Sequence, residues 1–198
     1  MSTFSRAAIA IAGMTGLAAA QPKADPRPAD PKAAPARPAD AGAETKPPPE
    51  LAEMAKSAAG TWHCKGQGMD RNQRMIDMTA TMKLRLDVAS WWMHGSFESR
   101  MGKELFTFES FTTFDPKTRK WNRVMVESGG NWSSGDSSGL KDGKIDWELV
   151  THSPTTGEGM FRDHEDLSDP KAGARMSGEF SPDKGKTWVK VYDIACKK

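Results

Sequence analysis

The chain has 198 residues, of which 37% are hydrophobic, and a formal net charge of +2. This near balance of charge, with no basic run that alternates with aromatic residues, argues against a nucleic-acid-binding groove. The longest apolar run lies near the N-terminus and is too short to cross a bilayer, so we expect no membrane span.

Residues 1–20 resemble a cleavable signal peptide. Arg6 provides the positive charge, Ala7 to Leu17 form the apolar run, and Ala18 to Ala20 provide small residues for cleavage. No cysteine follows directly, so we expect a periplasmic or secreted protein that is not a lipoprotein. Residues 21–49 are rich in Pro, Ala and charge, which predicts a disordered linker. The folded domain is then expected at 50–198.

The domain begins with one short predicted helix and continues with strands. Apolar residues recur at helical spacing from Glu50 to Ala59, and such a helix could close one end of a barrel. From Ile76 to Val88 every even position is apolar and every odd position is polar, which predicts one strand about 40 Å long.

About ten strands are predicted in total, and turn signals separate them. The strongest hairpin signal is Asp142-Gly143, which favours a type I′ turn. SPDKGKTW at 181–188 matches the Asp-box pattern, which we interpret as a structural turn. The expected strands are 61–67, 76–88, 91–101, 104–114, 120–127, 131–138, 144–152, 159–167, 173–180 and 186–195.

The two cysteines, Cys64 and Cys196, lie in the first and last of these strands. An even pair in an exported chain predicts a disulfide, which would place the first and last strands side by side. That adjacency favours an all-β, up-and-down barrel of antiparallel strands, with a two-sheet β-sandwich as the alternative.

Candidate functional residues are mainly tryptophans. Seven tryptophans and twelve methionines provide large adaptable side chains for a core or for a pocket that holds an apolar ligand. The expected pocket wall is formed by Trp62, Trp92, Trp121 and Trp147. His164 lies in the charged run RDHED, where a carboxylate could orient it as a base or metal ligand, but we favour a solvated, charged strand as the explanation of this run. No nucleophile elbow, HExxH motif or phosphate loop is present, so we expect no catalytic residue, no metal site and no cofactor.

Three segments carry a family resemblance: GTWHCKGQG, FTTFDPKTRKW and NWSSGDSSGLKDGKIDWELV. They resemble a bacterial domain family of unknown function with a lipocalin-like, calycin-type β-barrel. The resemblance runs from about Ala59 onwards and rests on Trp62, the turn Phe114-Asp115-Pro116, Trp121, Gly139 and Trp147. It implies a barrel but carries over no catalytic residue. Related nitrobindin-like barrels bind haem through a late histidine, and no histidine follows His164 here.

The expected function is binding of a small apolar or amphipathic ligand inside the barrel, without catalysis. The first alternative is a structural or interaction protein of the cell envelope with a filled barrel. The second is a haem-binding or metal-binding barrel that uses His164 or His152.

Overall fold

The computed structural model describes residues 46–169 and 171–198. The expected signal peptide, and the expected linker up to residue 45, lie outside these residues. One helix is followed by ten strands. Their bounds are α1 Pro49–Ala58, β1 Gly60–Met69, β2 Met75–Asp87, β3 Trp92–Met101, β4 Glu104–Asp115, β5 Lys120–Glu127, β6 Trp132–Ser137, β7 Lys144–Ser153, β8 Gly157–Asp166, β9 Ala174–Ser181 and β10 Val189–Lys197.

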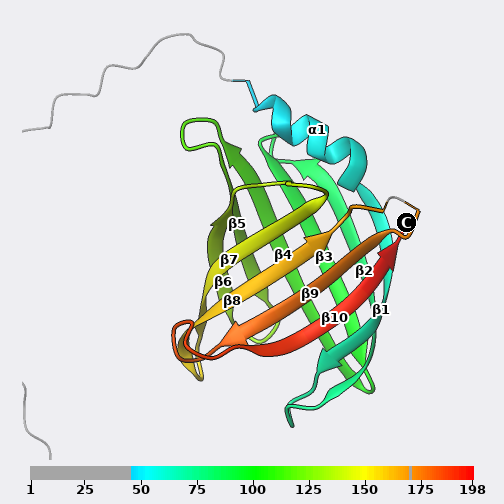
Figure 1. The fold of residues 1–198 in the computed structure, drawn as a ribbon, viewed down its shortest axis with the longest axis vertical. Coiled ribbons are helices and arrows are strands. Elements are labelled where there is room, and N and C mark those ends of the chain that lie inside the picture. The colour runs from blue at the N-terminus through cyan, green and yellow to red at the C-terminus, as the bar shows by residue number, and fades with distance from the viewer. Residues whose placement is uncertain (1–45, 170) are drawn as a thin grey trace, which may run out of the picture. The chain divides into compact units, whose positions relative to one another are not determined.

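The strands form one closed antiparallel barrel in which each strand pairs with its neighbour in sequence. β1 also pairs with β10, and this pairing closes the barrel (Figure 1). The predicted up-and-down barrel is therefore confirmed, and the sandwich alternative is wrong.

Side chains alternate between the inside and the outside of the barrel, as the period of two predicts. On β7, Ile145, Trp147 and Leu149 are buried, whereas the residues between them are exposed. The long predicted strand is β2, and it ends at Asp87 rather than at Val88. Val88 has a φ of +47°, the first of three successive positive φ values, and such a backbone cannot continue a strand.

Two inward-facing glycines let neighbouring strands approach closely. A Cβ on Gly66 would overlap the carbonyl oxygen of Asp193 in β10. A Cβ on Gly135 would overlap the carbonyl oxygen of Glu148 in β7. Each glycine thus permits a close strand contact at a point where any side chain would push the two strands apart.

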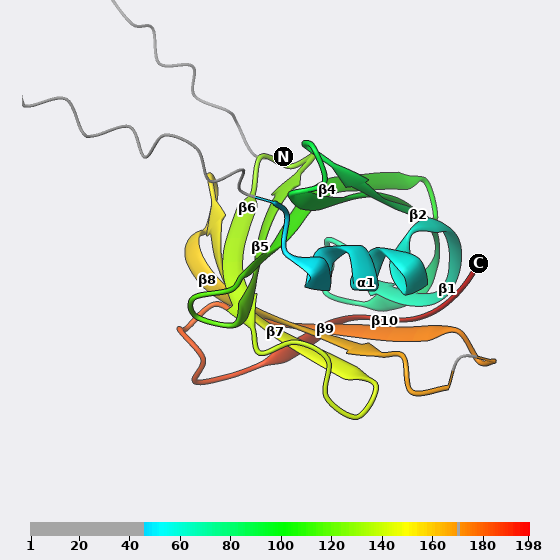
Figure 2. The same ribbon diagram turned by 90° about the horizontal axis from the view of Figure 1, so that it is seen from above.

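Helix α1 lies across one end of the barrel, as the view from above shows (Figure 2). Its Leu51 is completely buried in an apolar cluster with barrel residues that include Phe114, Trp121 and Trp147. The prediction of a short helix is confirmed, with its ends shifted by one residue. Because an apolar side chain fills this end, the helix acts as a plug.

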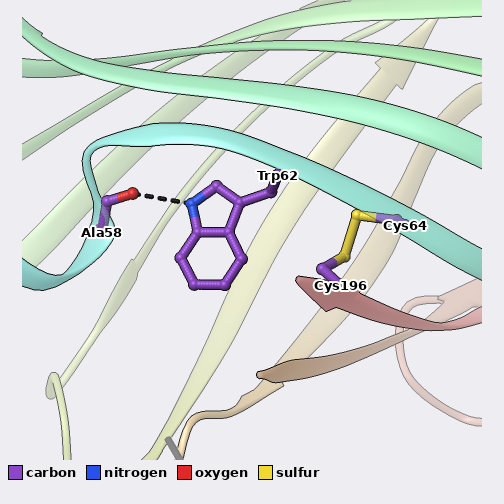
Figure 3. Close-up of a disulfide and its surroundings, with 4 residues drawn as sticks. All are labelled: Ala58, Trp62, Cys64 and Cys196. Atoms are coloured by element: carbon purple, nitrogen blue, oxygen red, sulfur yellow. Dashed lines mark hydrogen bonds between the residues drawn. A yellow bond between two sulfur atoms is a disulfide. The ribbon is translucent and has the colours of Figure 1, made fainter. Parts of the chain in front are cut away.

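The predicted disulfide is present between Cys64 and Cys196, whose Cα atoms are 4.0 Å apart and directly opposite each other in the β1–β10 register. Both cysteines are buried. Close to them, the indole Nε1 of Trp62 donates a hydrogen bond to the carbonyl oxygen of Ala58 at 2.8 Å (Figure 3). The start of β1 is therefore tied both to β10 and to the end of α1.

The Asp-box segment at 181–188 forms a turn, so its interpretation as a structural turn is confirmed. Asp183 accepts hydrogen bonds from the backbone N–H groups of Lys186 and Thr187, which holds the pKa of its carboxyl low, at about 2. These backbone donors are used within the turn, so β10 begins at Val189 and not at Lys186 as predicted.

Candidate functional site

A network of polar side chains meets inside the barrel. Arg123 comes from β5, Asp163 and Glu165 from β8, and Tyr192 from β10. On β5, Arg123 lies on the same face of the strand as Trp121 and Met125, both of which point inward and are buried. It therefore points into the barrel interior, which we call the lumen.

Arg123 reaches across the lumen to two carboxylates on β8. Its Nη1 lies 2.8 Å from Asp163 Oδ2, and its Nη2 lies 2.7 Å from Glu165 Oε1. Its Nε donates to Thr112 Oγ1 on β4 at 3.3 Å. Because all three guanidinium nitrogens are engaged, the side chain is held in one orientation.

Two aromatic residues complete the network. The Trp147 indole donates to Glu165 Oε1 at 3.0 Å, and the guanidinium carbon of Arg123 lies 3.7 Å from the centre of a Trp147 ring. The Tyr192 hydroxyl donates to Asp163. The six residues of the lumen network are Thr112, Arg123, Trp147, Asp163, Glu165 and Tyr192.

Burial controls the acid–base behaviour of the network. Removal from water, with the nearby negative charge of Glu165, raises the pKa of Asp163 to about 6. Burial and the same carboxylates raise the pKa of Tyr192 well above its usual value. The tyrosine therefore stays a neutral donor, whereas Asp163 can change its charge in the mildly acidic range.

The network keeps some accessible surface although it lies inside the barrel. The side chains of Arg123 and Glu165 are each 14% exposed. Inward-facing apolar residues are also only partly buried, among them Phe106, Phe108, Phe161 and Met82. The lumen thus combines a polar network with a partly accessible aromatic and methionine wall.

The structure separates the four tryptophans that were expected to line a pocket. Trp62, Trp121 and Trp147 face inward, but Trp147 is fully buried, Trp121 is 8% exposed and Trp62 bonds to the end of α1. Trp92 faces outward, in register with Asp87 of β2. It lines a shallow exterior hollow of about 170 Å³ together with Val88, Phe111 and Val124.

The histidines are also outside the lumen. His63, His94, His152 and His164 occupy outward positions on their strands, next to inward residues such as Cys64 and Asp163. His164 Nδ1 lies 2.6 Å from Asp146 Oδ1, beside an exterior polar hollow of about 400 Å³. Within residues 46–169 and 171–198, no three His, Cys, Asp or Glu side chains are grouped to hold a metal ion.

Sequence reasoning missed Arg123, Asp163, Glu165 and Tyr192. A usable signal was present, because Arg123 shares the alternation of Trp121 and Met125, which marks a charge on the apolar face of a strand. In RDHED, only His164 was considered as a candidate, whereas its two neighbours, Asp163 and Glu165, are the residues that face inward.

In its architecture the domain is a closed, ten-stranded up-and-down barrel with one helix-plugged end and a polar network inside. A crystal structure of Rv2717c from M. tuberculosis has a similar fold, with a TM-score of 0.60 at 11% sequence identity. The similarity covers 77% of this chain and 99% of that chain. No protein-family model matches the chain, and no curated protein matches it. Within the described residues no helix is long and apolar enough to cross a membrane.

Proposed function

We propose that this protein is an exported, non-catalytic binding protein that holds a small amphipathic molecule in the lumen. The observation that carries the proposal is the partly exposed lumen network beside an aromatic wall. Ligand sites typically combine mostly apolar walls with a few polar groups that fix the orientation of the ligand. The wall would contact the apolar body of the ligand, and the network would contact its polar head.

Stability alone is a weak explanation for the network. Replacing buried ion pairs by well-packed apolar residues is often neutral or stabilising, because the charges lose their hydration. Partial exposure adds to this argument, since Arg123 and Glu165 each keep surface that a ligand can contact. A charged network at this position is therefore better explained by recognition.

Export is part of the proposal. The signal-like residues 1–20 and the Pro-rich residues 21–49 support it, and a disulfide is typical of oxidising compartments outside the cytoplasm. Membership of the lipocalin-like family belongs to the proposal in the same way, supported by the three resembling segments and by the barrel.

Titration with N-phenyl-1-naphthylamine, a small apolar dye that fluoresces out of water, tests the function. We expect saturable binding of one dye per chain to the exported protein. β4 provides a matched pair of variants, because Phe108 faces the lumen and Phe111 faces outward next to His94. Phe108→Ala should weaken dye binding about tenfold, and Phe111→Ala should leave it unchanged. Absence of saturable binding, or equal loss in both variants, would contradict a lumenal site.

An exterior apolar surface favours the second candidate, an interaction protein. Val126 on β5 and Trp132 on β6 are directly paired, and they are 46% and 45% exposed. Val124 and Val150 extend the same outer face. If the dye does not bind, pull-down with the exported protein and with Trp132→Ser would test whether this surface holds a partner.

A further inference from the structure

The charges that face the lumen are unbalanced. Among the described strands, Arg123 is the only cation at an inward position. Inward carboxylates are Asp163 and Glu165 in the network and Glu127, which shares the inward alternation of Arg123 on β5. A further carboxylate, Glu104 at the start of β4, lies 3.4 Å from Arg71 of the β1–β2 loop. The lumen is therefore acidic when its carboxylates are ionised.

The hydrogen bonds of the network indicate which partner it can still accept. Arg123 uses one N–H each of Nε, Nη1 and Nη2 on Thr112, Asp163 and Glu165, and an anionic ligand would add a further negative charge beside these two carboxylates. Glu165, in contrast, accepts both of its bonds on Oε1. Among the described residues none donates to its Oε2. This oxygen is not sealed off from the surface, because it is absent from the fully buried side-chain atoms without a partner. The network therefore has a free acceptor oxygen on Glu165, and its two carboxylates outnumber its one cation, so its charge favours a cationic donor over an anion.

Two aromatic rings adjoin the network, because the hydroxyl of Tyr192 donates to Asp163 and the Tyr192 ring lies beside Phe161. Phe161 and Tyr192 have ring centres 6.4 Å apart, and both rings pack against Gly178, where a Cβ would overlap them. Aromatic faces attract cations as well as apolar groups. A positively charged head with an apolar body would thus find a carboxylate and ring faces together.

We infer that the lumen binds an amphipathic organic cation, an ammonium head on an alkyl or aryl body, with the head paired to Glu165 beside Asp163. This inference rests on the proposed function and names its ligand class. The head would cancel the excess negative charge that Arg123 leaves unpaired. Asp163, whose pKa is raised to about 6, would compete with it by taking up a proton at lower pH.

Three probes with the same octyl chain isolate the role of the head: octylammonium, octanoate and octanol. Isothermal titration calorimetry on the exported protein at pH 7.5 should give the tightest binding for octylammonium. We expect a preference of about tenfold over octanol, which corresponds to one charge-assisted hydrogen bond. Lowering the pH to 5 should weaken octylammonium binding and leave octanol binding unchanged, because Asp163 loses its charge over this range.

Glu165→Gln and Glu148→Gln form the matched pair of variants. The glutamine at 165 keeps an oxygen that accepts from Arg123 and Trp147, so the fold is expected to persist. Glu148 lies on the outer face of β7 and is 64% exposed. Glu165→Gln should abolish the preference for octylammonium, and Glu148→Gln should preserve it.

NMR of the indole N–H groups locates the bound probe. Octylammonium should shift the Trp147 signal, because this N–H donates to Glu165, and should leave that of the exposed Trp132 in place. A shift at Trp132 alone would place the probe on the exterior surface and overturn the inference.

The outcomes distinguish the two proposals. If octanoate or octanol binds as tightly as octylammonium, the lumen binds ligands but the cation inference is wrong. If the naphthylamine dye binds but none of the octyl probes does, the lumen again binds ligands and the cation inference is again wrong. If neither the octyl probes nor the dye bind, both proposals fail.

Discussion

The most informative single residue is Asp163. Its carboxyl is buried, accepts from Arg123 and Tyr192, and is paired in register with Trp147 on β7. Its pKa is raised because burial and the nearby negative charge of Glu165 together outweigh the attraction of Arg123. The network is therefore sensitive to pH through one group.

The stability of the protein should carry this pH dependence. A carboxyl with a pKa of about 6 when folded and about 4 when unfolded binds its proton more tightly in the folded state. The stability that this contributes is complete below about pH 4 and is lost as the pH rises through 6, by on the order of 2–3 kcal/mol. Asp163→Asn should remove the trend.

This pH dependence is measured by urea unfolding of the wild type and of Asp163→Asn at several pH values between 4 and 7.5. The difference in the free energy of unfolding between wild type and Asp163→Asn should change across pH 4–6. The exterior variant Glu148→Gln should run parallel to wild type. A difference that does not depend on pH would show that Asp163 titrates normally.

At the residue scale the sequence predicted the disulfide pairing better than it predicted the residues of the lumen network. Cys64 and Cys196 could be paired because no other cysteine competes. The tryptophans could be identified as core residues but not assigned to a face, since Trp91 and Trp92 are adjacent and a one-residue shift in the strand start exchanges their faces. The alternation of β5 could have placed Arg123 on the inner face, but its partners are 40 and 42 residues away, so the network that it forms could not be predicted.

Among the elements, α1 has the clearest separate role. Leu51 is 0% exposed and is surrounded by barrel residues, whereas the opposite side of the helix carries Glu53 and Lys56 in a solvent-exposed pair. Leu51 is therefore the fully buried contact between the helix and the barrel end, and Met54 packs against the same cluster.

Leu51→Ala should destabilise the domain by about 2–5 kcal/mol, because it removes buried atoms and leaves a cavity in the plug. Glu53→Ala is the control on the same helix. Its side chain is 74% exposed, and it should change the free energy of unfolding by less than about 0.5 kcal/mol. Equal midpoints of urea unfolding for the two variants would mean that the helix does not contribute as a plug.

The sequence predicted the turns whose backbone chemistry is local. Asp142 and Gly143 have φ values of +52° and +78°, as a type I′ turn requires. They lie in the connection between β6 and β7, where Lys141 and Lys144 on either side of the turn form an isolated β-bridge. A turn was predicted at residues 89 and 90, but it begins one residue earlier, at Val88, and its three positive φ values were not foreseen. None of its residues is glycine, so no local signal marks them.

For the whole molecule, closure is the central property. Nine of the strand pairings join neighbours in sequence, and the β1–β10 pairing alone joins distant parts of the described chain. Closure leaves no unpaired strand edge that could pair with another molecule. The disulfide lies on this closing pair, so it holds the seam of the barrel.

Replacing both cysteines by alanine tests that role. The disulfide links residues 132 apart, and constraint of the unfolded chain over a loop of this length is worth up to about 5 kcal/mol. We expect a large drop in the urea midpoint with the barrel still closed by hydrogen bonds, as judged by circular dichroism. Alanine suits both positions because they are buried. An unchanged midpoint would show that hydrogen bonding across the seam suffices.

The position of the two cysteines also sets an order of events during synthesis. Cys64 emerges 132 residues before the thiol that it needs, and the sequence contains no third cysteine with which it could pair wrongly. Until Cys196 arrives, an oxidised partner for Cys64 can come only from another molecule. Crowded production in an oxidising compartment should therefore yield one characteristic by-product, a dimer linked through cysteines, which dissociates on reduction.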